Sequence, residues 1–350
     1  IFYNSVAELR IIRFGSKLPQ RGILIYKAVK WCLSIFVVLL FIDLIMFHVV
    51  CSTDNCYAPY CGTMLCSLLT NNIYEFHIHV LYDDLSDENR LKLSTLVTSK
   101  HQSKCFFYNL CGFDLHENQV EGCRNLSKSA YYRLLLVSIL PTDIEKVLYL
   151  DCDIIVCGDI SYLWKIDLEN YAVAAISDLK IMPLNGIHSQ TLSMSYDLAY
   201  FNSGFMLVNL SYWRRYNLER RLLTFLKTHI VVFHDQDALN YVLKGKWFML
   251  PPQACCLNMV LYKLLYFKTK KDFYEYRKNR KVIHFVSDLK PWHDLMCYPN
   301  KNLFISYLNL TPWADTFEPV GVMRCTHAYL RMLNIIVRNY YFRIIFKLLN

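Results

Sequence analysis

The chain has 350 residues, of which 54% are hydrophobic, and a formal net charge of +9 at pH 7. The charge lies at the ends: residues 1–45 carry a net charge of +4 and residues 319–350 a net charge of +5, so residues 46–318 are neutral. A neutral body argues against a nucleic-acid-binding domain, and the length suffices for one large α/β domain. The 14 cysteines lack a compact spacing, which favours reduced thiols in a cytosolic setting over a disulfide scaffold.

Residues 31–50 form an apolar stretch that has to be weighed as a membrane segment. Asp43 lies inside it, and residues 46–51 are better explained as the first strand of the domain that follows. Without that strand about 15 residues remain, fewer than the roughly 20 that cross a bilayer. We therefore expect residues 1–45 to be a hydrophobic, basic leader or an interfacial helix, with a signal anchor as the alternative.

Strand and helix signals alternate after this stretch. Ser86 is a suitable N-cap for one helix, and Pro141 closes another. This alternation is typical of an α/β fold with a mostly parallel central sheet flanked by helices. The predicted elements are strands at 47–51, 77–82 and 105–110, and helices at 58–70, from 86 onward and at 127–140.

Two carboxylates follow the next strand. Asp151 and Asp153 come directly after the apolar residues Val147, Leu148 and Leu150. On an extended strand, this spacing turns both side chains to one face, where they can hold a hard cation such as Mg²⁺ or Mn²⁺. Such an ion is well placed to neutralise a diphosphate. For the motif alone, the alternative is that the aspartates cap a turn.

The second half of the chain continues with further polar strand ends. A predicted strand at 172–177 ends at Asp178, and a polar loop at 180–197 has the length of a lid or binding loop. A strand at 200–209 and a helix at 213–228 follow. The polar segments 234–240 and 282–293 complete the candidate site region.

Six motifs follow one another in a fixed order: Ser52-Thr53-Asp54-Asn55-x-Tyr57, Ser129-Ala130-x-Tyr132-Arg133, Leu150-Asp151-x-Asp153, Phe201-Asn202-Ser203-Gly204, Asp235-Gln236-Asp237-x-Leu239-Asn240, and His284 followed by Lys290-Pro291-Trp292. Together they resemble the family 8 retaining glycosyltransferases, and more narrowly the bacterial lipopolysaccharide core glucosyl- and galactosyltransferases. The resemblance implies a GT-A nucleotide-sugar-binding fold. We expect a catalytic domain at 46–295 and a helical extension at 296–350, preceded by the leader at 1–45, which has no counterpart in the family.

The resemblance also implies how a donor, UDP-glucose or UDP-galactose, would be bound. The metal would be Mn²⁺ or Mg²⁺, and an imidazole beside two carboxylates favours Mn²⁺, the softer ion. The metal ligands would be Asp151, Asp153 and His284; the uridine would contact Asp54, Asn55 and Tyr57; the donor would also contact Arg133 and Cys152.

The catalytic residues implied by the resemblance are Gln236, Asp235 and Lys290. Lys290 would stabilise the leaving UDP as a point charge, and Asp178, Asn202 and Asp235 would line the sugar pocket. Because Gln236 is a poor nucleophile, we expect the acceptor hydroxyl to attack on the face that the phosphate leaves. One departure is Ser287, where relatives commonly have glycine.

The C-terminal tail predicts a membrane contact. Arg324, Arg331 and Arg338 are seven residues apart among aromatic and aliphatic side chains. A helix of this kind would lie in an anionic membrane interface, or else would pack on the core with a solvated basic edge. A lipid-linked oligosaccharide acceptor would agree with a peripheral protein on the cytoplasmic face of the bacterial inner membrane.

Two other functions stay open at this point. A Golgi-lumenal member of the same superfamily, such as a xylosyltransferase, would explain the sequons at Asn125, Asn209 and Asn309. A non-catalytic sugar-nucleotide-binding relative is the second alternative, although every metal and diphosphate position of the motifs is filled.

Overall fold

The computed structural model describes residues 46–113, 128–178, 199–229, 231, 233–257, 270–286, 290–293 and 300–316. The chain divides into two units, Ile1–Met46 and Phe47–Asn350, and the elements described below belong to the second. The predicted leader at 1–45, the loop at 180–197, Ser287 and the basic tail with Arg324, Arg331 and Arg338 lie outside the described residues.

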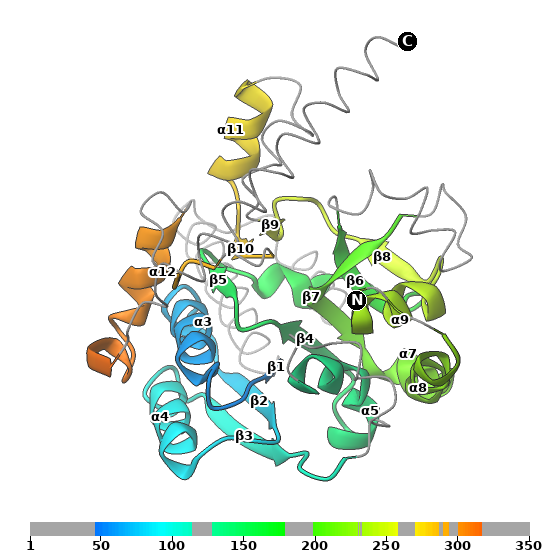
Figure 1. Cartoon of the computed structure of the whole chain (residues 1–350). Helices are drawn as coiled ribbons and strands as arrows, with labels where there is room; N and C mark the ends of the chain where they lie inside the picture. Colours follow the sequence, from blue (N-terminus) through cyan, green and yellow to red (C-terminus); the bar gives the residue numbers. More distant parts are fainter. Residues whose placement is uncertain are drawn as a thin grey trace, which may run out of the picture. The chain divides into compact units, whose positions relative to one another are not determined.

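A seven-stranded sheet forms the centre of the described part of the chain (Figure 1). Its strands are β1 (Phe47–Ser52), β2 (Phe76–Tyr82), β3 (Lys104–Asn109), β4 (Lys146–Leu150), β6 (Val173–Ser177), β7 (Phe201–Asn209) and β8 (Trp247–Met249). They lie in the order β3-β2-β1-β4-β7-β6-β8, and all neighbours are parallel except that β7 runs antiparallel to both β4 and β6. The expected α/β fold with a mostly parallel sheet is confirmed.

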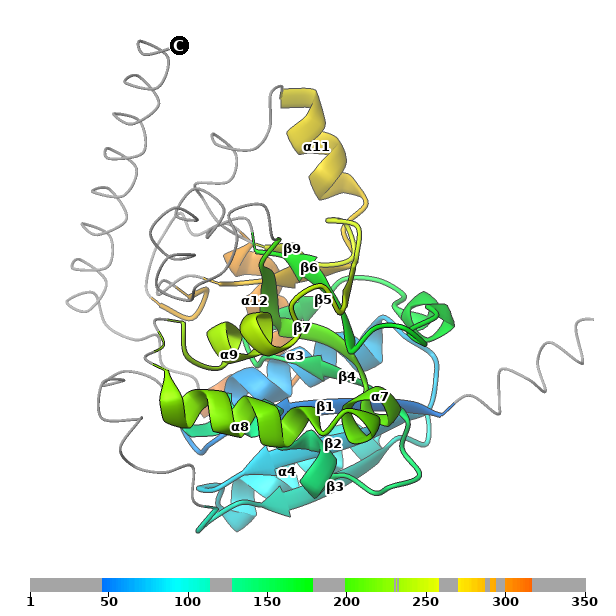
Figure 2. The same cartoon turned by 90° about the vertical axis from the view of Figure 1, so that its right-hand side faces the viewer.

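Helices cover both faces of this sheet because successive side chains of a strand point to opposite sides. On β1, Val49 and Cys51 enter a core closed by α3 (Ala58–Thr70) and α4 (Asp87–Thr98). Val50 enters a second core, to which the helices of the opposite face contribute (Figure 2). Those helices are α5 (Leu136–Ile139), α7 (Leu210–Arg215), α8 (Leu218–Thr228) and α9 (His234–Val242).

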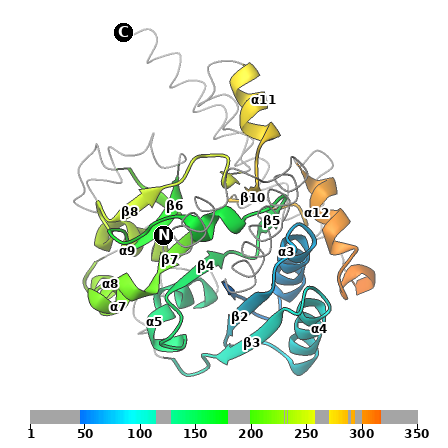
Figure 3. The ribbon, with the colours of Figure 1, turned by 180° about the vertical axis from the view of Figure 1, so that it is seen from behind.

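A smaller sheet follows the aspartate motif. It consists of β5 (Ile154–Val156), β10 (Val282–His284) and β9 (Cys256–Leu257), in the order β5-β10-β9. Strands β10 and β5 lie side by side (Figure 3) and pair antiparallel. In their register, His284 lies opposite Ile154. This register places His284 next to Asp153, the residue that precedes β5.

The remaining described helices lie outside the two sheets. Helix α12 (Lys301–Leu308) packs on α3, and α11 (Lys270–Lys278) precedes β10. Among the described residues, none of the helices combines the length and the apolar character that a bilayer crossing would require.

Two predicted helices differ from the structure. The segment 128–140 forms a 3-10 helix, η2 (Lys128–Leu134), and the single turn α5, where the Glu219 carboxylate accepts the N–H groups of Val137 and Ser138. The predicted helix at 213–228 begins earlier and consists of α7 and α8, with Asn217 between them at a φ of 50°. Asparagine adopts this left-handed conformation at low cost, which explains the break.

The aspartate motif is not part of a strand, although the apolar residues before it predicted an extended strand there. Strand β4 ends at Leu150, and Asp151 to Asp153 make the turn that leads into β5. The turn alternative was therefore right for the backbone, yet both side chains still meet at one place.

Candidate active site

Backbone hydrogen bonds fix the turn that carries the two aspartates. The N–H of Asp151 donates to the carbonyl of Gly204 at 2.9 Å, and the N–H of Phe285 donates to the carbonyl of Asp153 at 2.9 Å. The buried Cys152 thiol donates to the carbonyl of Ser52 at 3.1 Å. The turn is thus tied to β7, to β10 and to the end of β1.

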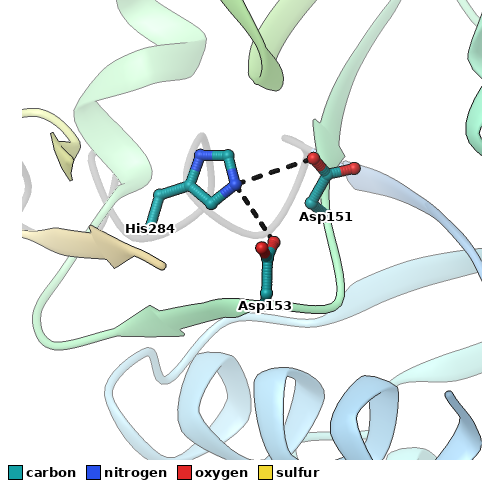
Figure 4. A group of neighbouring side chains, drawn as sticks. All are labelled: Asp151, Asp153 and His284. Atoms are coloured by element: carbon teal, nitrogen blue, oxygen red, sulfur yellow. Dashed lines mark ion pairs between the residues drawn. The ribbon is translucent and has the colours of Figure 1, made fainter. Parts of the chain in front are cut away.

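Asp151, Asp153 and His284 converge on one point (Figure 4). His284 Nε2 lies 3.6 Å from Asp151 Oδ2 and 3.0 Å from Asp153 Oδ1. All three ligand atoms lie within 4.8 Å of one another. Two carboxylates and an imidazole form a donor set that suits Mn²⁺ and related divalent ions. The three residues predicted as metal ligands are therefore brought together.

Two further observations agree with a cation between these groups. His284 directs Nε2 at both carboxylates, while its buried Nδ1 has no hydrogen-bond partner among the described residues. A Cβ at Gly204 would lie 2.3 Å from Asp151 Oδ2 and 2.3 Å from His284 Cε1. Glycine at this strand position keeps the space between the ligands open.

Two basic side chains neutralise the aspartates. Arg133 Nη2 lies 2.8 Å from Asp151 Oδ1, and the Lys290 ammonium pairs with Asp153. Burial alone would raise the pKa of the Asp153 carboxyl, but Lys290 and His284 outweigh it and hold the pKa well below its usual range. Asp153 is therefore ionised and able to bind a cation at neutral pH.

Arg133 connects the metal-ligand cluster to α9. It is buried, with Nε 3.2 Å from Asp235 Oδ2, and Nη1 donates to the carbonyl of Ser203 at 2.9 Å. Burial would lower the pKa of Arg133, but the negative charges of Asp151 and Asp235 outweigh it and raise the pKa. Burial raises the pKa of Asp235, although Arg133 opposes this. Asp235 is thus a paired, buried acid.

Gln236, Asp178 and Asn202 form a second polar group. Gln236 Nε2 donates to Asp178 Oδ2 at 3.1 Å, and Gln236 Oε1 accepts the N–H of Ser203 at 3.0 Å. Asn202 Nδ2 donates to the same Asp178 oxygen at 3.1 Å. These contacts join the carboxyl end of β6, the start of β7 and the first turn of α9. The end of β6 lies beside the start of β7 because the two strands are antiparallel.

The predicted uridine residues lie at the carboxyl end of β1. Asp54 Oδ1 accepts the N–H of Tyr57 at 2.9 Å, and the Tyr57 ring is 40% exposed. That ring meets the Trp292 indole edge-on at a centroid distance of 6.0 Å, and Tyr60 stacks on Trp292 at 3.8 Å. Trp292 is two residues from Lys290 in the sequence, so the same short segment carries the indole and the ammonium.

Asn55 has a structural role that its motif did not reveal. Its Nδ2 donates to Asp84 Oδ1 at 2.9 Å, and its Oδ1 accepts the N–H of Ser86 at 2.8 Å. Both ends of the amide thus tie the loop after β1 to the start of α4, where Ser86 caps the helix as expected. The uridine contact proposed for Asn55 stays a prediction.

Ser203 and Gly204 are site residues to which the sequence assigned no role. The Ser203 hydroxyl donates to Asp235 Oδ2 at 2.9 Å, and its backbone contacts Gln236 and Arg133. A glycine inside a predicted strand is a signal of close approach by another group, and this signal could have identified Gly204. Sequence alone does not show which group approaches.

The sheet and the acidic turn after its central strand define an α/β protein with a candidate divalent-cation site. The sequence model of glycosyl transferase family 8 matches residues 48–296, and the chain belongs to this family. The family resemblance drawn from the ordered motifs is therefore confirmed.

Known proteins agree with this assignment. General stress protein A of Bacillus subtilis (strain 168) is 32% identical over 289 residues, which are 79% of this chain and 98% of that protein. Lipopolysaccharide 1,2-glucosyltransferase of Escherichia coli (strain K12) is 26% identical over 276 residues, 77% of this chain and 79% of that protein. The crystal structure of galactosyltransferase LgtC in complex with donor and acceptor sugar analogs superposes with a TM-score of 0.66 at 25% identity and covers 76% of this chain and 96% of LgtC. The GT-A fold expectation is confirmed.

Proposed function

We propose that the protein is a retaining hexosyltransferase that moves glucose or galactose from a UDP-sugar to a lipopolysaccharide core oligosaccharide, with Mn²⁺ or Mg²⁺ bound. The observation that carries this proposal is the convergence of Asp151, Asp153 and His284 beside Lys290. The Gln236 group lies on the other side of Arg133, at the same edge of the sheet.

The arrangement supports a donor lying along this edge. Tyr57 and Asp54 would hold the uridine, and Lys290 would meet the diphosphate. A divalent cation at Asp151, Asp153 and His284 would supply charge neutralisation for the departing UDP. Lys290, whose ammonium lies beside the Asp153 carboxylate, would stabilise the negative charge that develops on the leaving phosphate.

The geometry of Gln236 favours transfer with retention through front-face attack. The amide is uncharged and is held by Asp178 and Ser203, so it can orient the sugar and stabilise positive charge at its anomeric carbon. Asp235 is paired with Arg133 and is therefore a poor nucleophile. The acceptor hydroxyl then attacks from the side of the leaving diphosphate, whose oxygen takes up the hydroxyl proton.

The lipopolysaccharide acceptor rests on relatives rather than on a contact within the site. The support comes from the 26% identical lipopolysaccharide 1,2-glucosyltransferase, whereas the name of the 32% identical relative specifies no acceptor. A lipid-linked acceptor also agrees with the basic, aromatic C-terminal tail, through which the protein would lie at the cytoplasmic face of the inner membrane.

One sequon weakens the Golgi alternative. The Asn209 amide donates to the carbonyl of Leu168 at 2.7 Å, and its oxygen accepts the N–H of Tyr212 at 2.9 Å as the N-cap of α7. The same nitrogen also donates to the carbonyl of Tyr171 at 3.3 Å, and a glycan would replace one of its two hydrogens, so a glycan there would disturb these contacts. Asn309 is exposed, and Asn125 lies outside the described residues.

The experiment that tests this function identifies the transfer product. The full chain is incubated with Mn²⁺, lipopolysaccharide core oligosaccharides and, in separate reactions, UDP-glucose, UDP-galactose and UDP-xylose. We expect transfer from one of the two hexose donors, and proton NMR of the product should show an α-glycosidic linkage, since the donor sugar is α-linked. A β-linked product would contradict retention, and transfer only from UDP-xylose would favour the Golgi alternative.

A further inference from the structure

Both oxygens of the Asp153 carboxylate are used within the protein. Oδ1 lies 3.0 Å from His284 Nε2, and Oδ2 pairs with the Lys290 ammonium. The same ammonium donates to the carbonyl of Phe285 at 2.7 Å. Lys290, the side chain that is expected to bind the diphosphate, therefore pairs with Asp153, a predicted metal ligand.

Several contacts hold Lys290 in this place. Its side chain is 17% exposed and that of Asp153 is 12% exposed, so the pair is largely shielded from water. The backbone N–H of Lys290 donates to His293 Nδ1 at 3.1 Å. Phe285, which accepts from the ammonium, donates its own N–H to the carbonyl of Asp153 at 2.9 Å. The backbone of Phe285 therefore contacts both the Lys290 ammonium and the Asp153 backbone.

Arg133 is bound in a different way. Its closest contact with Asp151 is to Oδ1 at 2.8 Å, whereas Oδ2 lies 3.5 Å from Arg133 Nη1 and 3.6 Å from His284 Nε2. The Arg133 guanidinium also contacts Asp235 and the carbonyls of Ala130 and Ser203. Its side chain is only 6% exposed. A divalent ion would repel both basic groups, but Arg133 is also held by Asp235 and two carbonyls. Among the described residues the Lys290 ammonium is held by Asp153 and the Phe285 carbonyl, so it is the group that the ion displaces more easily.

We propose that Lys290 is the counter-cation of the metal-free centre, and that metal binding at Asp153 displaces its ammonium toward the diphosphate of the donor. The inference rests on the proposed function, because it takes the same cluster as the metal site. It adds a coupling between the two binding steps. The metal binds more tightly when a bound diphosphate pairs with the displaced Lys290 ammonium, and the diphosphate binds more tightly when the metal has displaced that ammonium from Asp153.

Binding of Mn²⁺ to the full chain without any donor tests this coupling. Electron paramagnetic resonance of unbound Mn²⁺ gives the Kd, and UDP is then added at saturation. In Lys290→Met the Asp153 charge has no competing cation, so we expect Mn²⁺ alone to bind roughly tenfold more tightly than to the unmodified protein. UDP should then strengthen Mn²⁺ binding less in the variant than in the unmodified protein.

Two variants serve as controls. Lys290→Arg keeps a cation near Asp153 and should leave the Kd for Mn²⁺ near its original value. Lys227→Met removes an exposed charge from α8 and should have no effect. Thermal unfolding of Lys290→Met shows whether the variant is folded; if it is not, Lys290→Gln makes the same test.

The outcomes separate this inference from the proposed function. If the unmodified protein binds both Mn²⁺ and UDP but the Lys290→Met Kd for Mn²⁺ alone is unchanged or weaker, the counter-cation role is wrong while the metal site stands. If the unmodified protein binds neither Mn²⁺ nor UDP, the proposed function fails, and this inference fails with it.

Discussion

Replacing Gly204 with alanine is expected to lower metal-dependent turnover of the sugar nucleotide by about a hundredfold or more. The added Cβ would lie 2.3 Å from Asp151 Oδ2 and from His284 Cε1, so at least one ligand has to move. Because Gly204 also accepts the backbone N–H of Asp151, the whole turn would shift with it. The measurement is kcat with a saturating donor, together with the Kd for Mn²⁺.

Gly62→Ala provides a matched control. A Cβ at Gly62 would lie 2.3 Å from the Trp313 ring, so the clash is as severe but does not involve a metal ligand. We expect Gly62→Ala to lower the melting temperature while the folded protein retains Mn²⁺ binding. Unaltered Mn²⁺ affinity and turnover in Gly204→Ala would show that the Asp151 and His284 side chains do not act as ligands.

Arg133→Met is expected to destabilise the fold by roughly 3 to 5 kcal/mol at pH 7. Arg133 is buried between Asp151 and Asp235, and its removal leaves two carboxylates without their cation. Methionine fills similar volume, so the loss is mainly electrostatic. Urea unfolding followed by circular dichroism gives the free energy of unfolding of both proteins.

The pH dependence of this loss gives an internal check. Burial already raises the pKa of Asp235 above its unfolded value, and the pKa rises further without Arg133. A raised carboxyl pKa means that ionised Asp235 costs stability at high pH, and that protonation relieves this cost as the pH falls through the folded pKa. The difference between Arg133→Met and the unmodified protein should therefore shrink from pH 7 to pH 5.

A second substitution makes the Arg133 prediction more specific. Asp235→Asn in the Arg133→Met background removes one of the two uncompensated charges and should restore part of the lost stability. The same Asp235→Asn change alone should destabilise the protein, because it removes a partner of Arg133. If the double variant is less stable than Arg133→Met, the charge argument is wrong.

Much of the site could be predicted because its residues follow strands. Asp151 and Asp178 come directly after a predicted strand, and Asp54 lies three residues beyond another. The carboxyl ends of parallel strands share one edge of a sheet. Strand and helix alternation is a local signal, so it predicted the sheet and most element bounds correctly. The motif order then identified the family before any contact was known.

The contacts within the site could not be predicted from local patterns. The antiparallel direction of β7 places Gly204 beside Asp151, and no residue near either position encodes that direction. The double role of Asn55 and the stacking of Tyr60 on Trp292 likewise join segments far apart in the chain. Periodicity also could not show the break at Asn217, because side chains on both sides of it continue the apolar pattern.

Turnover of UDP-sugars in the absence of acceptor tests most directly whether the Asp151, Asp153 and His284 cluster is a catalytic metal centre. The unmodified protein and Asp153→Asn are compared with UDP-glucose and UDP-galactose, with Mn²⁺ and with a chelator. We predict slow hydrolysis of one donor that requires Mn²⁺ and falls by about a hundredfold or more in Asp153→Asn. Equal turnover in the variant, or folded unmodified protein that neither hydrolyses nor binds a UDP-sugar with Mn²⁺ present, would contradict the account.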